Sequence, residues 1–92
     1  RPPFNIFAMS DLYAFGVMRE AQLRGLRIGR DVKLVGFDDQ SLARDWGITT
    51  VRQPIEQMGE KAVNMMLQRL ERPGKEVESL CLKPEMVERE SA

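Results

Sequence analysis

Three polar side chains stand at the ends of short stretches rich in apolar or β-branched residues. They are Ser10, Asp38 and Gln53, in a chain of 92 residues. A carboxylate accepts hydrogen bonds from two ligand groups at once, and such charged bonds are the stronger kind. A carboxamide both donates and accepts. We therefore predict that these three residues bind a small ligand rich in hydroxyl or N–H groups, such as a sugar or a nucleobase-like compound.

Most residue pairs used in nucleophilic or acid–base catalysis are missing. The chain has no histidine, and Cys81 is its single cysteine. Ser-His and Cys-His pairs, histidine acid–base chemistry and the commonest zinc ligand are therefore excluded. The sequence also has no G-x-G-x-x-G run and no complete P-loop. We expect no enzymatic activity, no catalytic residue, no metal ion and no cofactor.

A remote alternative uses paired acids. Asp38 and Asp39, together with Asp11, could hold Mg²⁺ for phosphoryl transfer, as in receiver domains or aspartate-based phosphatases. Such sites also need a lysine and a serine or threonine at other strand tips. No lysine ends any of the first three expected strands, and the phosphatases use Asp-x-Asp rather than Asp-Asp-Gln.

Each candidate ligand residue also has a purely structural interpretation. Ser10 or Asp11 can cap the helix that follows them, and we expect Asp11 to be mainly structural. Asp39 can be a turn residue that faces water. Gln53 can simply precede a proline in an extended conformation. Asp38 is the hardest to explain in this way, because it stands directly at the tip of an apolar strand.

The elements that must position these side chains follow from apolar patterning and breaker residues. We predict strands at 5–9, 32–37 and 48–52 and helices at 12–24 and 54–70. An irregular stretch with one helical turn is expected at 40–47, a turn at 72–75, a strand at 77–82 and a weaker one at 85–88. The order β-α-β-β-α-β predicts an α/β fold with a parallel sheet and right-handed crossovers. The carboxyl ends of parallel strands form the usual ligand crevice.

The two helices differ in their apolar faces. The helix at 54–70 has one apolar stripe and one charged side, which predicts one buried face. The helix at 12–24 has an apolar stripe through Ala14 and Met18 and a second apolar side through Leu12 and Phe15. A helix that is apolar on two sides must bury both, so we expect a second subunit or a missing part of the chain to cover one of them. The alternative is a helix enclosed within its own domain.

The composition of the chain excludes some classes of binding partner. The 14 basic and 14 acidic residues balance and are mixed along the chain, which argues against this segment gripping a phosphate backbone by itself. No apolar run approaches the roughly 18 residues of a membrane span, so we expect no membrane partner. A lone cysteine fits a reducing compartment. The first residues lack an initiator methionine and a signal-peptide pattern, so the chain reads like a piece cut from a longer one.

Four segments in order resemble one family, the lac repressor/galactose repressor-type transcription regulators. The segments are IFAMSD at 6–11 with AFG at 14–16, GLRIGRDV at 25–32 with VGFDD at 35–39, TTVRQP at 49–54 with MG at 58–59, and RES at 89–91. The resemblance spans nearly all of the chain. It implies a type I periplasmic-binding-protein fold, in which two α/β lobes close on a small molecule. Residues 1–92 would be a fragment of the C-terminal lobe, without the first lobe and the DNA-binding headpiece.

The resemblance also implies roles for residues. Asp38 would be the main ligand carboxylate of the lobe, with Ser10 and Gln53 beside it. The family usually has asparagine at the position of Ser10, so this side chain has a shorter reach. Leu12, Phe15 and Trp46 would lie in the dimer contact.

The implied protein is a cytoplasmic homodimer. Its small-molecule effector controls operator binding allosterically, and DNA is contacted only through a headpiece outside this chain. The main alternative is a solute-binding protein of a sugar transport system, which shares the fold and is exported.

Overall fold

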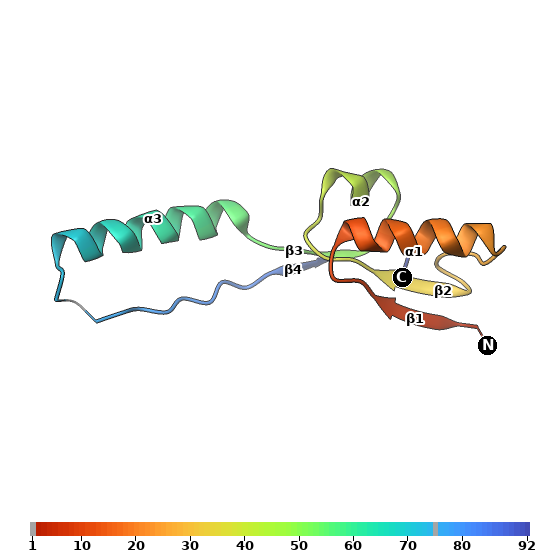
Figure 1. Ribbon diagram of the computed structural model, residues 1–92, viewed down its shortest axis with the longest axis horizontal. Coiled ribbons are helices and arrows are strands. Elements are labelled where there is room, and N and C mark those ends of the chain that lie inside the picture. The colour runs from red at the N-terminus through yellow and green to blue at the C-terminus, as the bar shows by residue number, and fades with distance from the viewer. Residues whose placement is uncertain (1, 75) are drawn as a thin grey trace. The chain divides into compact units, whose positions relative to one another are not determined.

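The computed structural model describes residues 2–74 and 76–92, which form two compact units. Unit 1 contains the described residues up to Gln53 together with Glu85–Ala92, and unit 2 is Pro54–Pro84. The elements, labelled in Figure 1, are β1 (Phe4–Phe7), α1 (Asp11–Leu23), β2 (Val32–Val35), α2 (Ser41–Asp45), β3 (Thr50–Arg52), α3 (Ile55–Glu71) and β4 (Glu85–Val87).

The strands of unit 1 form a ladder in the order β1-β2-β3-β4. β1 and β2 are parallel, with Phe4 opposite Val32. β2 reaches β3 through a parallel bridge between Val35 and Thr49, and the Gly36 amide donates to the Thr49 carbonyl at 2.8 Å. The parallel arrangement of the first three strands is therefore confirmed. β4 pairs antiparallel with β3, so the sheet is mixed at this edge.

One expected strand is wrong. Residues 77–82 form no strand, and Val77 and Leu80 are exposed. Their alternation of apolar residues is typical of a strand, but a strand also needs a neighbour to accept its backbone hydrogen bonds. The weaker expectation at 85–88 is the one that is confirmed, as β4, because β3 supplies that neighbour.

α1 has a defined beginning and end. The Ser10 side chain accepts a hydrogen bond from the Tyr13 amide at 3.3 Å and caps the first turn. At the other end Gly25 has φ +73°, and the Leu26 amide returns to the Ala21 carbonyl at 2.8 Å, which is a Schellman ending. These two signals explain why the sequence-based helix at 12–24 matches the observed helix closely.

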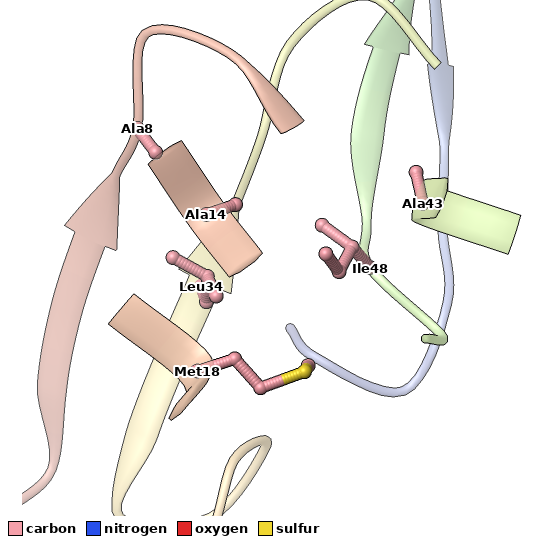
Figure 2. Close-up of a cluster of buried hydrophobic side chains, with 6 residues drawn as sticks. All are labelled: Ala8, Ala14, Met18, Leu34, Ala43 and Ile48. Carbon is pink, nitrogen blue, oxygen red and sulfur yellow. The ribbon is translucent and has the colours of Figure 1, made fainter. Parts of the chain in front are cut away.

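The core of unit 1 lies where α1 packs on the sheet. Figure 2 shows six of its buried side chains, which come from α1, α2, β2 and the segments that follow β1 and precede β3: Ala8, Ala14, Met18, Leu34, Ala43 and Ile48. Three of the six are alanines, which lets the α1 backbone approach the sheet closely. The stripe through Ala14 and Met18 is therefore the face that α1 buries, as its pattern predicts.

Ser91, near the end of the given chain, is hydrogen-bonded to β2 and to the segment that precedes β3. Its hydroxyl accepts from the Thr49 amide at 2.7 Å and donates to the Leu34 carbonyl at 2.5 Å. The Ser91 backbone amide donates to the Gly47 carbonyl, and the Ser91 carbonyl accepts from the Leu34 amide. The residue is 1% exposed. Ser91 thus supplies partners for β2 and for the start of β3 where the two strands separate.

We expect Ser91→Ala to lower the free energy of unfolding by about 2 kcal/mol, because it leaves the buried Leu34 carbonyl and Thr49 amide without their side-chain partner. Calorimetric unfolding of the full-length protein measures the change. Ser79→Ala, at an exposed serine of unit 2, is the matched control. Equal melting temperatures for the two variants would remove this role from Ser91.

Unit 2 contains α3 and an extended segment. None of the residues of α3 is buried, so the expected burial of its apolar stripe is not observed. The stripe residues that lie exposed include Ile55, Met58, Met66 and Leu70. Among the described residues, no helix combines the length and the apolar character needed to cross a bilayer.

Candidate ligand-binding site

The structure brings Asp38 and Gln53 into direct contact. The Gln53 side-chain amide donates to Asp38 Oδ1 at 2.7 Å, and both residues are half-buried. They meet because β2 and β3 run parallel and end together, with the Asp38 amide donating to the Val51 carbonyl at 2.9 Å. Two sequence-predicted site residues therefore share one edge of the sheet.

Ser10 reaches the same edge from β1. Its neighbour Asp11 donates its backbone amide to the Phe37 carbonyl at 3.0 Å, which places the start of α1 beside the residue that precedes Asp38. No hydrogen bond joins the Ser10 side chain to Asp38 or Gln53 in the described part of the chain. The Ser10 hydroxyl oxygen is used as the α1 cap, and its proton stays available to a ligand.

The backbone at the tip of β2 is unusual. Asp38 has φ +103° and Asp39 has φ +55°, the two non-glycine residues with positive φ in the described chain. Residues other than glycine avoid this region, although aspartate and asparagine enter it more readily than most. Such conformations cost about 1–3 kcal/mol each and gather at functional sites. The turn that presents Asp38 is therefore held by its surroundings rather than by local preference.

Asp39 is the strongest electrostatic feature of this edge. Its carboxylate accepts from Arg52 Nε at 2.7 Å and from Arg89 Nη2 at 2.9 Å, and its side chain is only 6% exposed. Burial alone would raise the pKa of Asp39, but the hydrogen bonds and charges of the two arginines outweigh burial and hold the pKa below its usual range. The interpretation of Asp39 as a water-facing turn residue is wrong.

Asp11 is structural, as expected from the sequence. The residue is completely buried, and its carboxylate accepts from the Thr50 hydroxyl at 2.7 Å and the Gln40 amide at 2.6 Å. It crosses from the start of α1 to β3 and the loop after β2. A side chain at Gly36 would collide with Asp11 Oδ1, so the glycine makes room for this carboxylate.

The geometry gives no support to the magnesium alternative. The carboxylates of Asp11 and Asp39 are occupied by a hydroxyl, an amide and two arginines. No group of three or more acidic or thiol side chains within residues 2–74 and 76–92 converges as metal ligands do. Asp38 is the carboxylate of the three that keeps an open oxygen, because no described residue bonds Oδ2.

The edge can therefore bind polar ligand groups. Asp38 Oδ2 accepts, the Ser10 hydroxyl donates, and the Gln53 carbonyl oxygen accepts. Three such groups at the ends of adjacent parallel strands match hydroxyls that point in different directions from one small molecule. Its role as a ligand site stays a prediction that the geometry permits.

The predicted dimer-contact residues lie on α1 and directly after α2, where Trp46 is the C-cap. The rings of Phe15 and Trp46 meet edge to face, with centroids 5.0 Å apart and planes at 71°. Leu12, one turn before Phe15, is 62% exposed, and Trp46 is 48% exposed. We call Leu12, Phe15 and Trp46 the α1–α2 patch. Two large apolar side chains so exposed on neighbouring helices are typical of an interaction surface.

Comparisons with known proteins agree with this architecture. The model of the periplasmic binding protein-like domain matches residues 1–92. The chain is 38% identical to the ribose operon repressor of Haemophilus influenzae over 97% of its own length and 27% of that protein. The structure of the transcriptional regulator CelR–cellobiose complex is similar with a TM-score of 0.89 and 32% identity, over 96% of this chain and 28% of that one.

A third similar protein has been solved as a dimer on DNA. The lac repressor dimer bound to operator and the anti-inducer ONPF is similar with a TM-score of 0.83 and 27% identity, over 98% of this chain and 32% of that one. The chain thus spans about a quarter of the curated relatives' length. It belongs to the periplasmic binding protein-like domain family, in the form found in transcription regulators of the lac repressor kind.

Proposed function

We propose that the chain is the effector-binding and dimerisation portion of a bacterial transcription regulator, from the C-terminal lobe of a two-lobed domain. The observation that carries the proposal is the Asp38–Gln53 pair, held on a strained turn at the carboxyl ends of β2 and β3 with one carboxylate oxygen open. A first lobe and a DNA-binding headpiece outside this chain complete the pocket and the readout. The site binds its ligand and performs no reaction on it.

The effector that fits best is a sugar or a related metabolite. Carboxylate and carboxamide groups bind vicinal hydroxyls through charged and neutral hydrogen bonds. The names of two relatives point the same way, because one is a ribose operon repressor and another is a complex with cellobiose. The transport-protein alternative is less well supported, since these relatives are regulators.

A thermal-shift screen of the full-length protein tests the effector class. The panel contains D-ribose, cellobiose, adenine and guanine, each at millimolar concentration. A ligand at 100 times its Kd stabilises the folded state by about 2.7 kcal/mol, so a bound sugar raises the melting temperature visibly. Stabilisation by a sugar supports the proposal. Stabilisation by a nucleobase alone, or by no compound, contradicts the sugar assignment.

The proposed mechanism is allosteric. Effector binding between two lobes changes their relative position and that of the dimer, and so changes the operator affinity of the headpieces. Coupling of this kind is typically about 1–3 kcal/mol and acts equally in both directions. A regulator of this type works where its DNA is, so we place the protein in the cytoplasm.

The α1–α2 patch is proposed as part of a homodimer interface. Leu12 is exposed in the single chain. We expect Leu12→Glu in the full-length protein to weaken dimerisation by about 30-fold or more, because the charge would have to be buried in the proposed apolar contact. Sedimentation velocity across a concentration series measures the dimer fraction. Asn64→Glu adds the same charge at an exposed position of α3, outside the patch, and leaves the dimer intact. A Leu12→Glu protein that stays as dimeric as wild type would exclude the patch.

A further inference from the structure

We propose that Arg89 is a positioning residue for the ligand site: it clamps Asp39 from the far end of the chain and thereby holds Asp38 in its strained, ligand-facing conformation. The proposal rests on the function proposed above, because it assigns a purpose to the orientation of Asp38. Arg89 itself contacts neither Asp38 nor Gln53 through any described hydrogen bond.

Arg89 is suited to this task because it is itself held on several sides. Its Nη1 donates to the Ile48 carbonyl at 2.9 Å, while Nη2 donates to Asp39 Oδ1 at 2.9 Å. Its backbone amide donates to the Thr49 hydroxyl at 2.8 Å, and that hydroxyl donates back to the Arg89 carbonyl at 2.9 Å. The side chain is 14% exposed. A guanidinium fixed in this way gives Asp39 a rigid anchor.

Arg52, the second arginine that holds Asp39, is the more exposed of the two. It also reaches Asp39, but its side chain is 45% exposed and it divides its donors between Asp39 and Glu85. Surface ion pairs of this kind contribute little, whereas a nearly buried charged pair is specific in its geometry. Arg89 is therefore the better fixed of the two guanidinium groups that hold the Asp39 carboxylate.

Asp39 transmits the constraint to its neighbour. Asp38 and Asp39 both have positive φ, so neither keeps its conformation without outside contacts. The Asp39 amide donates to the Thr50 hydroxyl at a long 3.3 Å, so the carboxylate, held by two arginines at 2.7 and 2.9 Å, is the firmer of the two ties that Asp39 itself makes. Because the two residues share a peptide bond, loosening Asp39 frees the Asp38 side chain to leave Gln53 and the ligand.

The test compares Arg89→Met, which keeps length without charge, with Arg89→Lys and with a control, Arg30→Met. Arg30 is exposed and pairs with Asp31, away from this turn. Hydrogen–deuterium exchange of the full-length protein is read at residues 36–40 and, as a reference within the same sheet, at residues 4–8. Binding of D-ribose and cellobiose is read by calorimetry on the same proteins.

We expect Arg89→Met to raise exchange at residues 38 and 39 by about tenfold and to weaken sugar binding by a similar factor, the loss expected for one charged hydrogen bond. Residues 4–8 keep the wild-type rate. Arg89→Lys recovers part of both losses, because lysine keeps the charge but not both bonds. Arg30→Met behaves as wild type.

Three results overturn the proposal. If Arg89→Met leaves the exchange rate at residues 36–40 unchanged, Arg89 does not hold the turn. Equal acceleration at 4–8 and 36–40 shows a general loss of stability instead of positioning. A loosened turn with unaltered sugar affinity shows that the orientation of Asp38 does not matter for binding. Failure of wild type to bind either sugar counts against the proposed effector class, while the exchange measurement still decides whether Arg89 controls the turn.

Discussion

The full-length protein with Asp38→Ala is expected to lose its effector response while it still binds operator DNA. Asp38 is the one carboxylate at the edge of the sheet with an oxygen open to a ligand, and its other oxygen is held by Gln53. Losing the charged hydrogen bond that Oδ2 accepts from the ligand costs up to about 3 kcal/mol, which is a fall in affinity of up to about 100-fold. Calorimetric titration with the sugar found in the thermal-shift screen measures the loss.

Two further variants separate charge from conformation. Alanine is poorly suited to the φ of +103° at Asp38, whereas asparagine tolerates it. Asp38→Asn therefore keeps the turn and an acceptor for Gln53, but it loses the charge and replaces the open acceptor Oδ2 with an NH2 donor. We expect it to bind at least about tenfold more weakly than wild type. Asp45→Ala, at an exposed acid that ends α2, is the control for charge alone. Wild-type affinity in Asp38→Ala would remove Asp38 from the site.

Replacing Asp11 with alanine is expected to have the largest effect on stability. Its completely buried carboxylate joins α1 to β3 and to the loop after β2 through Thr50 and Gln40. The change removes two charged hydrogen bonds and leaves the buried Thr50 hydroxyl without its acceptor, for a loss of about 3 kcal/mol or more. The melting temperature of the protein falls by about 6 °C or more.

The matched control again is Asp45→Ala, which removes an exposed aspartate and leaves the melting temperature within about 1 °C of wild type. Asp11→Asn keeps the shape and one acceptor, so its loss is expected to lie between the two. A melting temperature of Asp11→Ala equal to that of the control would mean that this carboxylate does not tie the elements together.

The sequence predicts the position of the candidate site well because parallel strands have a simple geometry. Asp38 and Gln53 follow successive apolar strands, and parallel pairing brings their ends together without further information. α1 is predictable for a similar reason, since Ser10 and Gly25 are local signals for its two ends. In each case the structure is determined by residues that are close in sequence.

What the sequence does not predict depends on distant partners. Asp39 looks like a turn residue until Arg89, 50 residues later in the chain, is placed beside it. Ser91 has no local pattern that would mark it as a bridge between Leu34 and Thr49. A signal for Arg89 and Ser91 was nevertheless present, because both belong to the segment at 89–91 that matches the family.

Two other predictions, a strand at 77–82 and a buried face of α3, are wrong because they were made from local patterns alone. Residues 77–82 have a local strand pattern, and the apolar stripe of α3 has a local burial pattern. Neither is fulfilled within unit 2, because local propensity becomes structure only where another element covers it. Pattern alone predicts which face needs a partner, and it does not say which part of the protein provides one.

A crystal structure of the full-length protein with a bound sugar from the screen tests the central claim most directly. The account predicts a ligand hydroxyl within about 3 Å of Asp38 Oδ2, with the Gln53 amide still on Oδ1 and further ligand groups facing Ser10 and Gln53. A sugar bound at a place from which Asp38 and Gln53 are out of reach would contradict it. The contact between Asp38 and Gln53 would then have a structural role only.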